Sequence, residues 1–251
     1  MSSKPPTNAE KKRLRQERAA AALREKQRRE RRRQILTVIG VVAAIAVVIG
    51  GGFFINSQRD TSKDVATSIP AVGSTFGVTV GDDSAPHQII VYEDFLCPIC
   101  GEFEKAGGEQ LAALADAGKV QIEYRPFVLL DRYGPYSERA TRIWGLVLDQ
   151  DGQEVAKTFH DQLFANQPSE GGPFPSEDEL VALAGEAGAD TAQLQTAVDS
   201  GAGADFPADA TKLALDELKL QGTPTVFLDG ELFTDWRTPD DLAVNLVKAV
   251  Q

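Results

Sequence analysis

Two cysteines that directly follow an apolar segment constrain the fold of this chain more than any other feature. Cys97 and Cys100 are the only cysteines among 251 residues. They follow HQIIVYEDF, His87 to Phe95, whose β-branched and aromatic residues predict a buried strand. The segment after Cys97 is typical of a helix with Pro98 in its first position. We therefore expect the pair at a strand-to-helix junction, with Cys97 at the N-terminus of the helix.

Three chemistries compete for this C-x-x-C pair. As a structural disulfide, its four-residue loop would contribute only about 1.9 kcal/mol. A structural zinc site needs four ligands, and His87 and His160 are the only histidines that could complete it, while copper(I) needs just two soft ligands. A physical mechanism supports a reactive dithiol, because free N–H groups and the dipole at a helix N-terminus lower the pKa of a thiol. We favour this chemistry, with Cys97 as the attacking thiolate, Cys100 as the resolving thiol and no metal.

The first 55 residues differ from the remainder in charge and hydropathy. Residues 1–33 hold 13 of the 26 basic residues but only four of the 37 acidic ones. An uncharged run of 21 residues follows at 35–55, long enough to cross about 30 Å of hydrocarbon as a helix. The positive-inside rule then predicts a cytoplasmic basic arm at 1–34, a transmembrane signal anchor at 35–55 and an extracytoplasmic remainder. A cleaved signal peptide is the alternative, and the arm lacks the aromatics or folded module of a nucleic-acid binder.

The remaining residues predict a tether at 56–75 and one α/β domain at 76–251. Lys119 to Phe127 is typical of a second strand, and the helix that begins at Pro98 is expected to kink at Gly107-Gly108. A helical block follows at about 137–203, including a capping box at Ser176-x-x-Glu179 and a helix capped by Asp190. The C-terminal part predicts a helix at about 207–221, a hairpin around Asp229-Gly230 and a last helix from Thr238 to Val250.

Two motifs in this domain resemble those of DsbA-like thiol-disulfide oxidoreductases, especially the membrane-anchored bacterial branch. They are the strand-to-CPIC junction, with Asp94 three positions before Cys97, and GTPTVFLDG at 222–230. The resemblance covers residues 76–250. It implies an α/β, thioredoxin-like fold with an inserted α-helical domain at about 137–203, preceded here by one transmembrane helix. It also implies a cis-proline at Pro224 that lies against the dithiol, with Thr223 beside it to hold the substrate chain.

The function that this resemblance implies is disulfide formation in exported proteins. The redox-active Cys97–Cys100 disulfide would serve without any other cofactor. The implied partners are exported proteins with reduced cysteines and a membrane quinone-linked thiol oxidase, with the membrane reached through one helix and no nucleic acid involved. Two alternatives stay open: a disulfide reductase of the same fold, and a non-enzymatic copper-binding or chaperone-like protein.

Two departures from the family pattern bear on the chemistry. The best-known oxidases carry His where this chain has Ile99, which cannot hydrogen-bond near the thiolate, so the direction of electron flow stays open. The buried strand acid of some relatives is not matched at Val91. Glu93 or Asp94 is a candidate to replace it as a proton relay, the alternative being an acid solvated at the strand end. His160 is expected to be a surface or a satisfied histidine.

Overall fold

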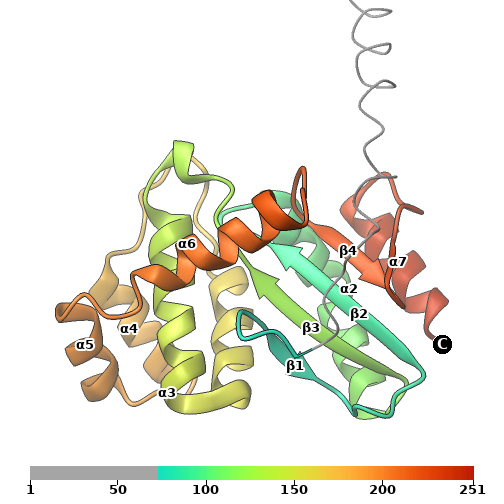
Figure 1. Ribbon diagram of the computed structural model, residues 1–251, viewed down its shortest axis with the longest axis horizontal. Coiled ribbons are helices and arrows are strands. Elements are labelled where there is room, and N and C mark those ends of the chain that lie inside the picture. The colour runs from blue at the N-terminus through green and yellow to red at the C-terminus, as the bar shows by residue number, and fades with distance from the viewer. Residues whose placement is uncertain (1–72) are drawn as a thin grey trace, which may run out of the picture. The chain divides into compact units, whose positions relative to one another are not determined.

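A five-stranded mixed sheet organises residues 73–251, the part of the chain that this computed structural model describes (Figure 1). The strand order is β1-β3-β2-β4-β5. The expected basic arm, the apolar run at 35–55 and nearly all of the tether lie outside the described residues. Within residues 73–251, none of the helices is both long and apolar enough to cross a membrane.

The centre of the sheet is the parallel pair of β2 (His87–Glu93) and β3 (Val120–Pro126), with Ile89 opposite Ile122. Both strands confirm the sequence prediction. Antiparallel strands extend the pair on either side: β1 (Val78–Val80) beside β3, and β4 (Thr225–Leu228) with β5 (Glu231–Leu232) beside β2. The sequence did not predict β1, because three residues are too few to display a strand period.

The alternation of side chains along β2 divides the core into two layers. Ile89 and Val91 pack on one face with buried residues of α2 (Pro98–Asp116) and α7 (Pro239–Ala249). Ile90 and Tyr92 pack on the other face with residues of α6 (Asp205–Lys212) and the adjoining π-helical turn η4 (Leu213–Glu217). A strand places successive side chains on opposite faces, so the run from Ile89 to Tyr92 lacks charged residues because both faces of the sheet are covered there. Figure 1 shows α6 crossing the sheet face opposite to α2.

Helix α2 runs without interruption from Pro98 to Asp116, so the expected kink at Gly107-Gly108 is wrong. Gly107 instead permits close packing against α7. A Cβ added at Gly107 would lie 2.8 Å from the Cβ of Ala243, closer than carbon atoms approach in real contacts. Gly107 is therefore needed for the close approach of α2 and α7, and it does not bend α2.

The helical block lies between β3 and β4, where the insertion was expected. It begins after a short 3-10 turn, η3 (Asp131–Tyr133), and contains α3 (Tyr136–Ala165), α4 (Glu177–Glu186) and α5 (Thr191–Asp199). Gly152 has a φ of 85° and divides α3 into the two helical halves that the sequence predicts. The capping box of Ser176 with Glu179 and the cap by Asp190 are both confirmed.

Candidate active site

The two cysteines occupy the first turn of α2, directly after the end of β2. Cys97 is the N-cap residue and Pro98 takes the first helical position, as the sequence predicts. The backbone N–H of Cys97 donates to Asp94 O at 2.9 Å, which closes the turn between strand and helix. Both cysteines are free thiols in this structure; Cys97 is 5% exposed and Cys100 is fully buried. An incoming sulfur can therefore reach Cys97, whereas Cys100 is screened by its own helix.

A loop from the far end of the chain lies against the outer thiol. The Thr223–Pro224 peptide bond is cis, in agreement with the family resemblance. The thiol of Cys97 donates to Thr223 O at 3.5 Å. The buried Thr223 hydroxyl is not engaged by another group among the described residues, so it is available to donate to the Cys97 thiolate and helps to lower the pKa of that thiol. The structure thus brings together Cys97, Cys100, Thr223 and Pro224, the residues that the sequence nominates for catalysis and substrate binding.

The pKa values of the two thiols are shifted in opposite directions. A hydrogen bond from the Cys100 thiol, aided by Thr223 and by backbone N–H groups of Ile99 and Cys100, outweighs burial and lowers the pKa of Cys97 to about 7. Burial raises the pKa of Cys100 well above its usual value, and the negative charge of Glu93 adds to this effect. Near neutral pH about half of the Cys97 thiols are therefore ionised, while Cys100 stays protonated.

The contacts of Asp94 indicate a structural role. They fit neither a solvated acid nor a proton relay, the two roles expected from the sequence. Its carboxylate is fully buried and accepts four hydrogen bonds, from the backbone N–H groups of Leu96, Leu129 and Leu130 and from the Ser137 hydroxyl, at 2.7 to 2.9 Å. It is therefore not a solvated acid. Four donors around an acceptor-only carboxylate also leave it no free position for relaying a proton. Asp94 ties the active-site turn to the segment that leads into α3.

Glu93, the neighbouring acid, is also fully buried and not solvated. Its Oε1 lies 2.5 Å from Nε2 of His160 on α3, and His160 Nδ1 lies 2.9 Å from Asp161 Oδ1. His160 is thus a satisfied histidine and not a surface one. Burial alone would lower the pKa of His160, but the charge of Glu93 and the two hydrogen bonds raise it to about 9. A proton-relay role for Glu93 stays a prediction.

Glu104 on α2 completes this polar group. Burial and the charge of Glu93 raise the pKa of Glu104 to about 8. One ligand atom from each of Glu93, Glu104 and His160 lies within 4.8 Å of the others, which is the spacing of residues that can hold a metal ion. No sequence motif marks this group, because its members come from three separate elements, β2, α2 and α3.

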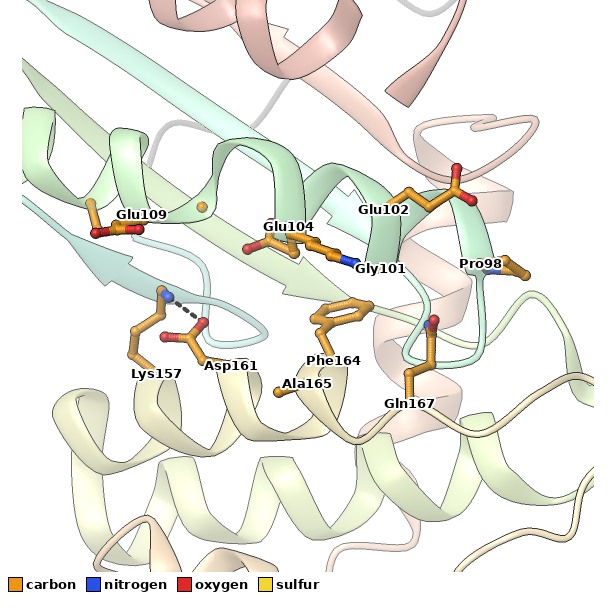
Figure 2. Close-up of a pocket in the computed structure, with 13 residues that line it drawn as sticks. Pro98, Gly101, Glu102, Glu104, Glu109, Lys157, Asp161, Phe164, Ala165 and Gln167 are labelled. Atoms are coloured by element: carbon orange, nitrogen blue, oxygen red, sulfur yellow. Dashed lines mark hydrogen bonds and ion pairs between the residues drawn. The ribbon is translucent and has the colours of Figure 1, made fainter. Parts of the chain in front are cut away.

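A cavity of about 730 Å³ runs beside the active-site helix, between α2 and α3 (Figure 2). Pro98 and Gly101 line it near the cysteines, and Glu104, Lys157 and Asp161 line it farther along. Its wall includes a second residue that the sequence does not reveal, Gln167. The side-chain amide of Gln167 donates to the carbonyl oxygens of Phe95 and Cys97, each at 2.9 Å. The segment that follows α3 within the insertion therefore holds the active-site turn directly.

Ile99, between the two cysteines, is 43% exposed. Its aliphatic side chain offers no hydrogen bond to the thiolate, and none of the described hydrogen bonds brings a histidine to Cys97. The thiolate is stabilised instead by Cys100, Thr223 and the helix N-terminus. This leaves the C-x-x-C turn with an apolar, solvent-facing residue at the position that the family often uses to tune the thiolate.

Comparison with known proteins agrees with the fold. A family model described as "Thioredoxin" matches residues 74–248. The crystal structure of oxidised DsbA from Mycobacterium tuberculosis is 31% identical in sequence, with a TM-score of 0.58, over 69% of this chain and 92% of that one. The chain belongs to the thioredoxin family, and within it to the DsbA-like proteins, with a helical insertion in a thioredoxin-like α/β fold.

Two curated proteins are also similar. The probable disulfide bond formation protein D of Bacillus cereus is 26% identical over 159 residues, which are 61% of this chain and 70% of that protein. The serine/threonine-protein kinase PknE of Mycobacterium tuberculosis is 28% identical over 176 residues, or 66% of this chain. The chain spans only 31% of the length of PknE. Most of the kinase therefore has no counterpart here, and no Gly-rich phosphate-binding loop stands out in the present sequence.

Proposed function

We propose that this protein catalyses thiol-disulfide exchange outside the cytoplasm, forming disulfides in exported proteins with reduced cysteines. The observation that carries this proposal is the unequal acidity of the pair, with a pKa of about 7 for the accessible Cys97 and a raised pKa for the buried Cys100. A thiolate is both the nucleophile and the better leaving group in disulfide exchange. Cys97 is thus suited to bond with substrates, and Cys100 to close or open the internal disulfide.

The oxidising cycle begins with the Cys97–Cys100 disulfide. A substrate thiolate attacks Cys97 Sγ, so that a mixed disulfide forms and Cys100 leaves, taking up a proton. A second substrate thiolate then attacks the substrate sulfur of the mixed disulfide and releases Cys97 as a thiolate. Two electrons pass from the substrate to the enzyme, and the substrate gains one disulfide. The contact of the Thr223–Pro224 segment with Cys97 supports a role for this segment in aligning the substrate chain during both attacks.

The reduced dithiol must be reoxidised before another cycle. We assign this step to a membrane quinone-linked thiol oxidase, which would accept the two electrons and release the two protons. The sequence supports an arrangement with residues 1–34 in the cytoplasm, a signal anchor at 35–55 and the catalytic domain on the outer side. The anchor would keep the catalytic domain close to this partner.

A reductase is the second candidate, and two features favour it. Ile99 offers no hydrogen bond to the thiolate, and the pKa of Cys97 is only moderately lowered. Thiol pKa values near 7 accompany reducing dithiols such as thioredoxin, whereas the strongly oxidising DsbA has a thiol pKa near 3.5. Cys97, at about 7, lies at the thioredoxin end of this range. In that direction Cys97 would attack a substrate disulfide, and Cys100 would resolve the mixed disulfide.

The test is the oxidation of a reduced, unfolded protein by the full-length enzyme in its disulfide form. We expect Cys97→Ser and Cys100→Ser each to abolish oxidation, because neither variant can form the internal disulfide. When the substrate is supplied in its disulfide form instead, Cys100→Ser should accumulate mixed disulfides, because Cys97 attacks the substrate and no second thiol resolves the product. The reduction potential of the Cys97–Cys100 pair decides the direction, since a potential near that of thioredoxin, about −270 mV, would favour the reductase. A copper(I) carrier would instead bind metal stoichiometrically and leave the test protein reduced.

A further inference from the structure

Three buried side chains meet where the helical insertion packs against the active-site strand and helix. Glu93 comes from the last position of β2, Glu104 from α2 and His160 from α3. A carboxylate oxygen of each glutamate and a ring nitrogen of His160 lie within 4.8 Å of one another. These residues belong to three separate elements, so the group exists only in the folded domain.

The group contains acceptor atoms that nothing in the described residues satisfies. Glu93 is 0% exposed, yet its Oε2 has no hydrogen-bond partner there. Oε1 of Glu104 is likewise buried without a partner. A buried carboxylate oxygen that is left unpaired costs about 1 to 3 kcal/mol or more. Glu93 and Glu104 each carry one such oxygen, and their side chains come within 4.8 Å of each other, so a cation between the two side chains would offset this cost.

His160 is already oriented as a metal ligand would be. Its Nδ1 lies 2.9 Å from Asp161 Oδ1, and Lys157 Nζ lies 2.5 Å from the same oxygen. A ligating histidine almost always donates its other ring N–H to a carboxylate or carbonyl, which fixes the tautomer and the ring orientation. Asp161 supplies this outer contact and leaves Nε2 facing Glu93. An ion would replace two protons: the one that Nε2 and Glu93 now share, and the one that Glu104 holds at neutral pH because its pKa is raised to about 8. Both protons would pass to solvent.

The cavity between α2 and α3 gives an ion a route to this group. Glu104, Asp161 and Lys157 line its wall, and Figure 2 shows Glu104 on α2 facing Lys157 and Asp161 on α3. Water in the cavity can occupy the remaining coordination positions. The route and the outer-shell carboxylate are two features expected of a genuine metal site.

The donor set selects the class of ion. Two carboxylates with one imidazole suit a divalent first-row transition ion such as Zn²⁺ or Mn²⁺ better than Ca²⁺ or Mg²⁺, which prefer oxygen ligands alone. Ligand atoms about 2.1 Å from a tetrahedral ion are about 3.4 Å apart. The Glu93–His160 contact of 2.5 Å would therefore open by about 1 Å, and Glu104 would close inward from the cavity wall.

We propose that Glu93, Glu104 and His160 bind a divalent transition-metal ion that fastens the helical insertion to β2 and α2. The proposal concerns these three side chains and does not depend on the redox activity of the cysteines. It predicts binding in the disulfide form of the protein, in which Cys97 and Cys100 cannot act as thiolate ligands.

The experiment is a Zn²⁺ titration of the untagged full-length chain in detergent, with the Cys97–Cys100 disulfide intact. The sequence contains only His87 and His160, so nuclear magnetic resonance of labelled histidine reports each ring separately. We expect one Zn²⁺ per chain, a shift of the His160 ring signals only, and a rise in Tm. His87, which pairs with Asp229 at the surface, is the internal control. Ca²⁺ at equal concentration should leave both rings unchanged.

Matched variants test the ligand set. Glu104→Gln should weaken Zn²⁺ binding at least tenfold, and Asp161→Asn should weaken it about 10- to 100-fold through the orientation of His160. Glu109→Gln alters an acid that lines the same cavity outside the group and should leave binding within twofold. Tm without metal shows that each variant is folded. The proposal fails if Zn²⁺ shifts only His87, if it binds only after the disulfide is reduced, or if Glu109→Gln weakens binding as much as Glu104→Gln.

Discussion

The sulfur of Cys97 lies 3.5 Å from the carbonyl oxygen of Thr223, a residue 126 positions later in the chain. The contact exists because β4, which begins at Thr225, pairs with β2, whose end leads into the cysteines. The sheet thus fixes the loop before β4 against the N-terminus of α2. This contact unites the two sequence motifs in one site and places the Thr223 hydroxyl beside the thiol.

Removal of that hydroxyl should make Cys97 less acidic. Thr223→Val keeps the size of the side chain, the backbone carbonyl and Pro224, but it removes a group that lowers the pKa of the thiol. We expect the pKa of Cys97 to rise above about 7, measured by the ultraviolet absorbance of the thiolate against pH. Thr234→Val, at an exposed threonine, is the control. An unchanged pKa of Cys97 in Thr223→Val would show that the Thr223 hydroxyl does not stabilise the thiolate.

The acidity of Cys97 also predicts how stability depends on pH. The folded-state pKa of about 7 lies below the value of about 8.5 for an unfolded cysteine. A lowered folded-state pKa adds stability that is complete above the unfolded pKa and is lost as the pH falls through the folded one. From about pH 6 to about pH 8, the reduced protein should therefore gain about 1 kcal/mol of unfolding free energy over the oxidised protein.

Urea unfolding of both redox forms at each pH measures this difference. The oxidised form is the control, because it shares every other titrating group and lacks the thiols. Above about pH 8.5 the raised pKa of the buried Cys100 acts in the opposite direction, so the test belongs below that pH. A difference that stays constant from about pH 6 to about pH 8 would contradict the lowered pKa of Cys97.

Structural features that depend on residues close in the sequence could be predicted from the sequence. The apolar run of β2, the capping box at Ser176, the N-cap at Thr238 and the Asp229-Gly230 hairpin each depend on neighbouring residues, and all of them are confirmed. Features that depend on a distant partner were missed or wrong. The role of Gly107 depends on Ala243, and the burial of Glu93 depends on His160, 67 positions away. Periodicity identifies the buried face of one segment, but it does not identify which polar groups lie opposite.

Asp94 provides a test of the structural role that replaces the expected relay. In Asp94→Asn, the amide group turns a donor toward backbone N–H groups that need an acceptor. A buried donor that loses its partner costs about 1 to 3 kcal/mol, so we expect an unfolding free energy lower by at least about 2 kcal/mol. Urea denaturation measures the loss, and Asp209→Asn, at an exposed position on α6, should change stability by less than about 0.5 kcal/mol. Unchanged stability with altered thiol reactivity would instead indicate that Asp94 acts on the cysteines.

The side chain at position 99 is expected to affect the direction of electron flow, because it lies between the two cysteines. Its side chain is 43% exposed, so Ile99→His can be accommodated without repacking the core. An imidazole at this position can donate a hydrogen bond to the Cys97 thiolate, which stabilises the reduced form relative to the disulfide. Lowering the pKa of Cys97 by one unit corresponds to about 1.4 kcal/mol, or a reduction potential about 30 mV more oxidising. Equilibration with glutathione measures the potential, and Ile99→Leu is the matched control. If the pKa falls while the potential stays constant, the disulfide form is stabilised equally, and Ile99 is not the residue that limits oxidising power.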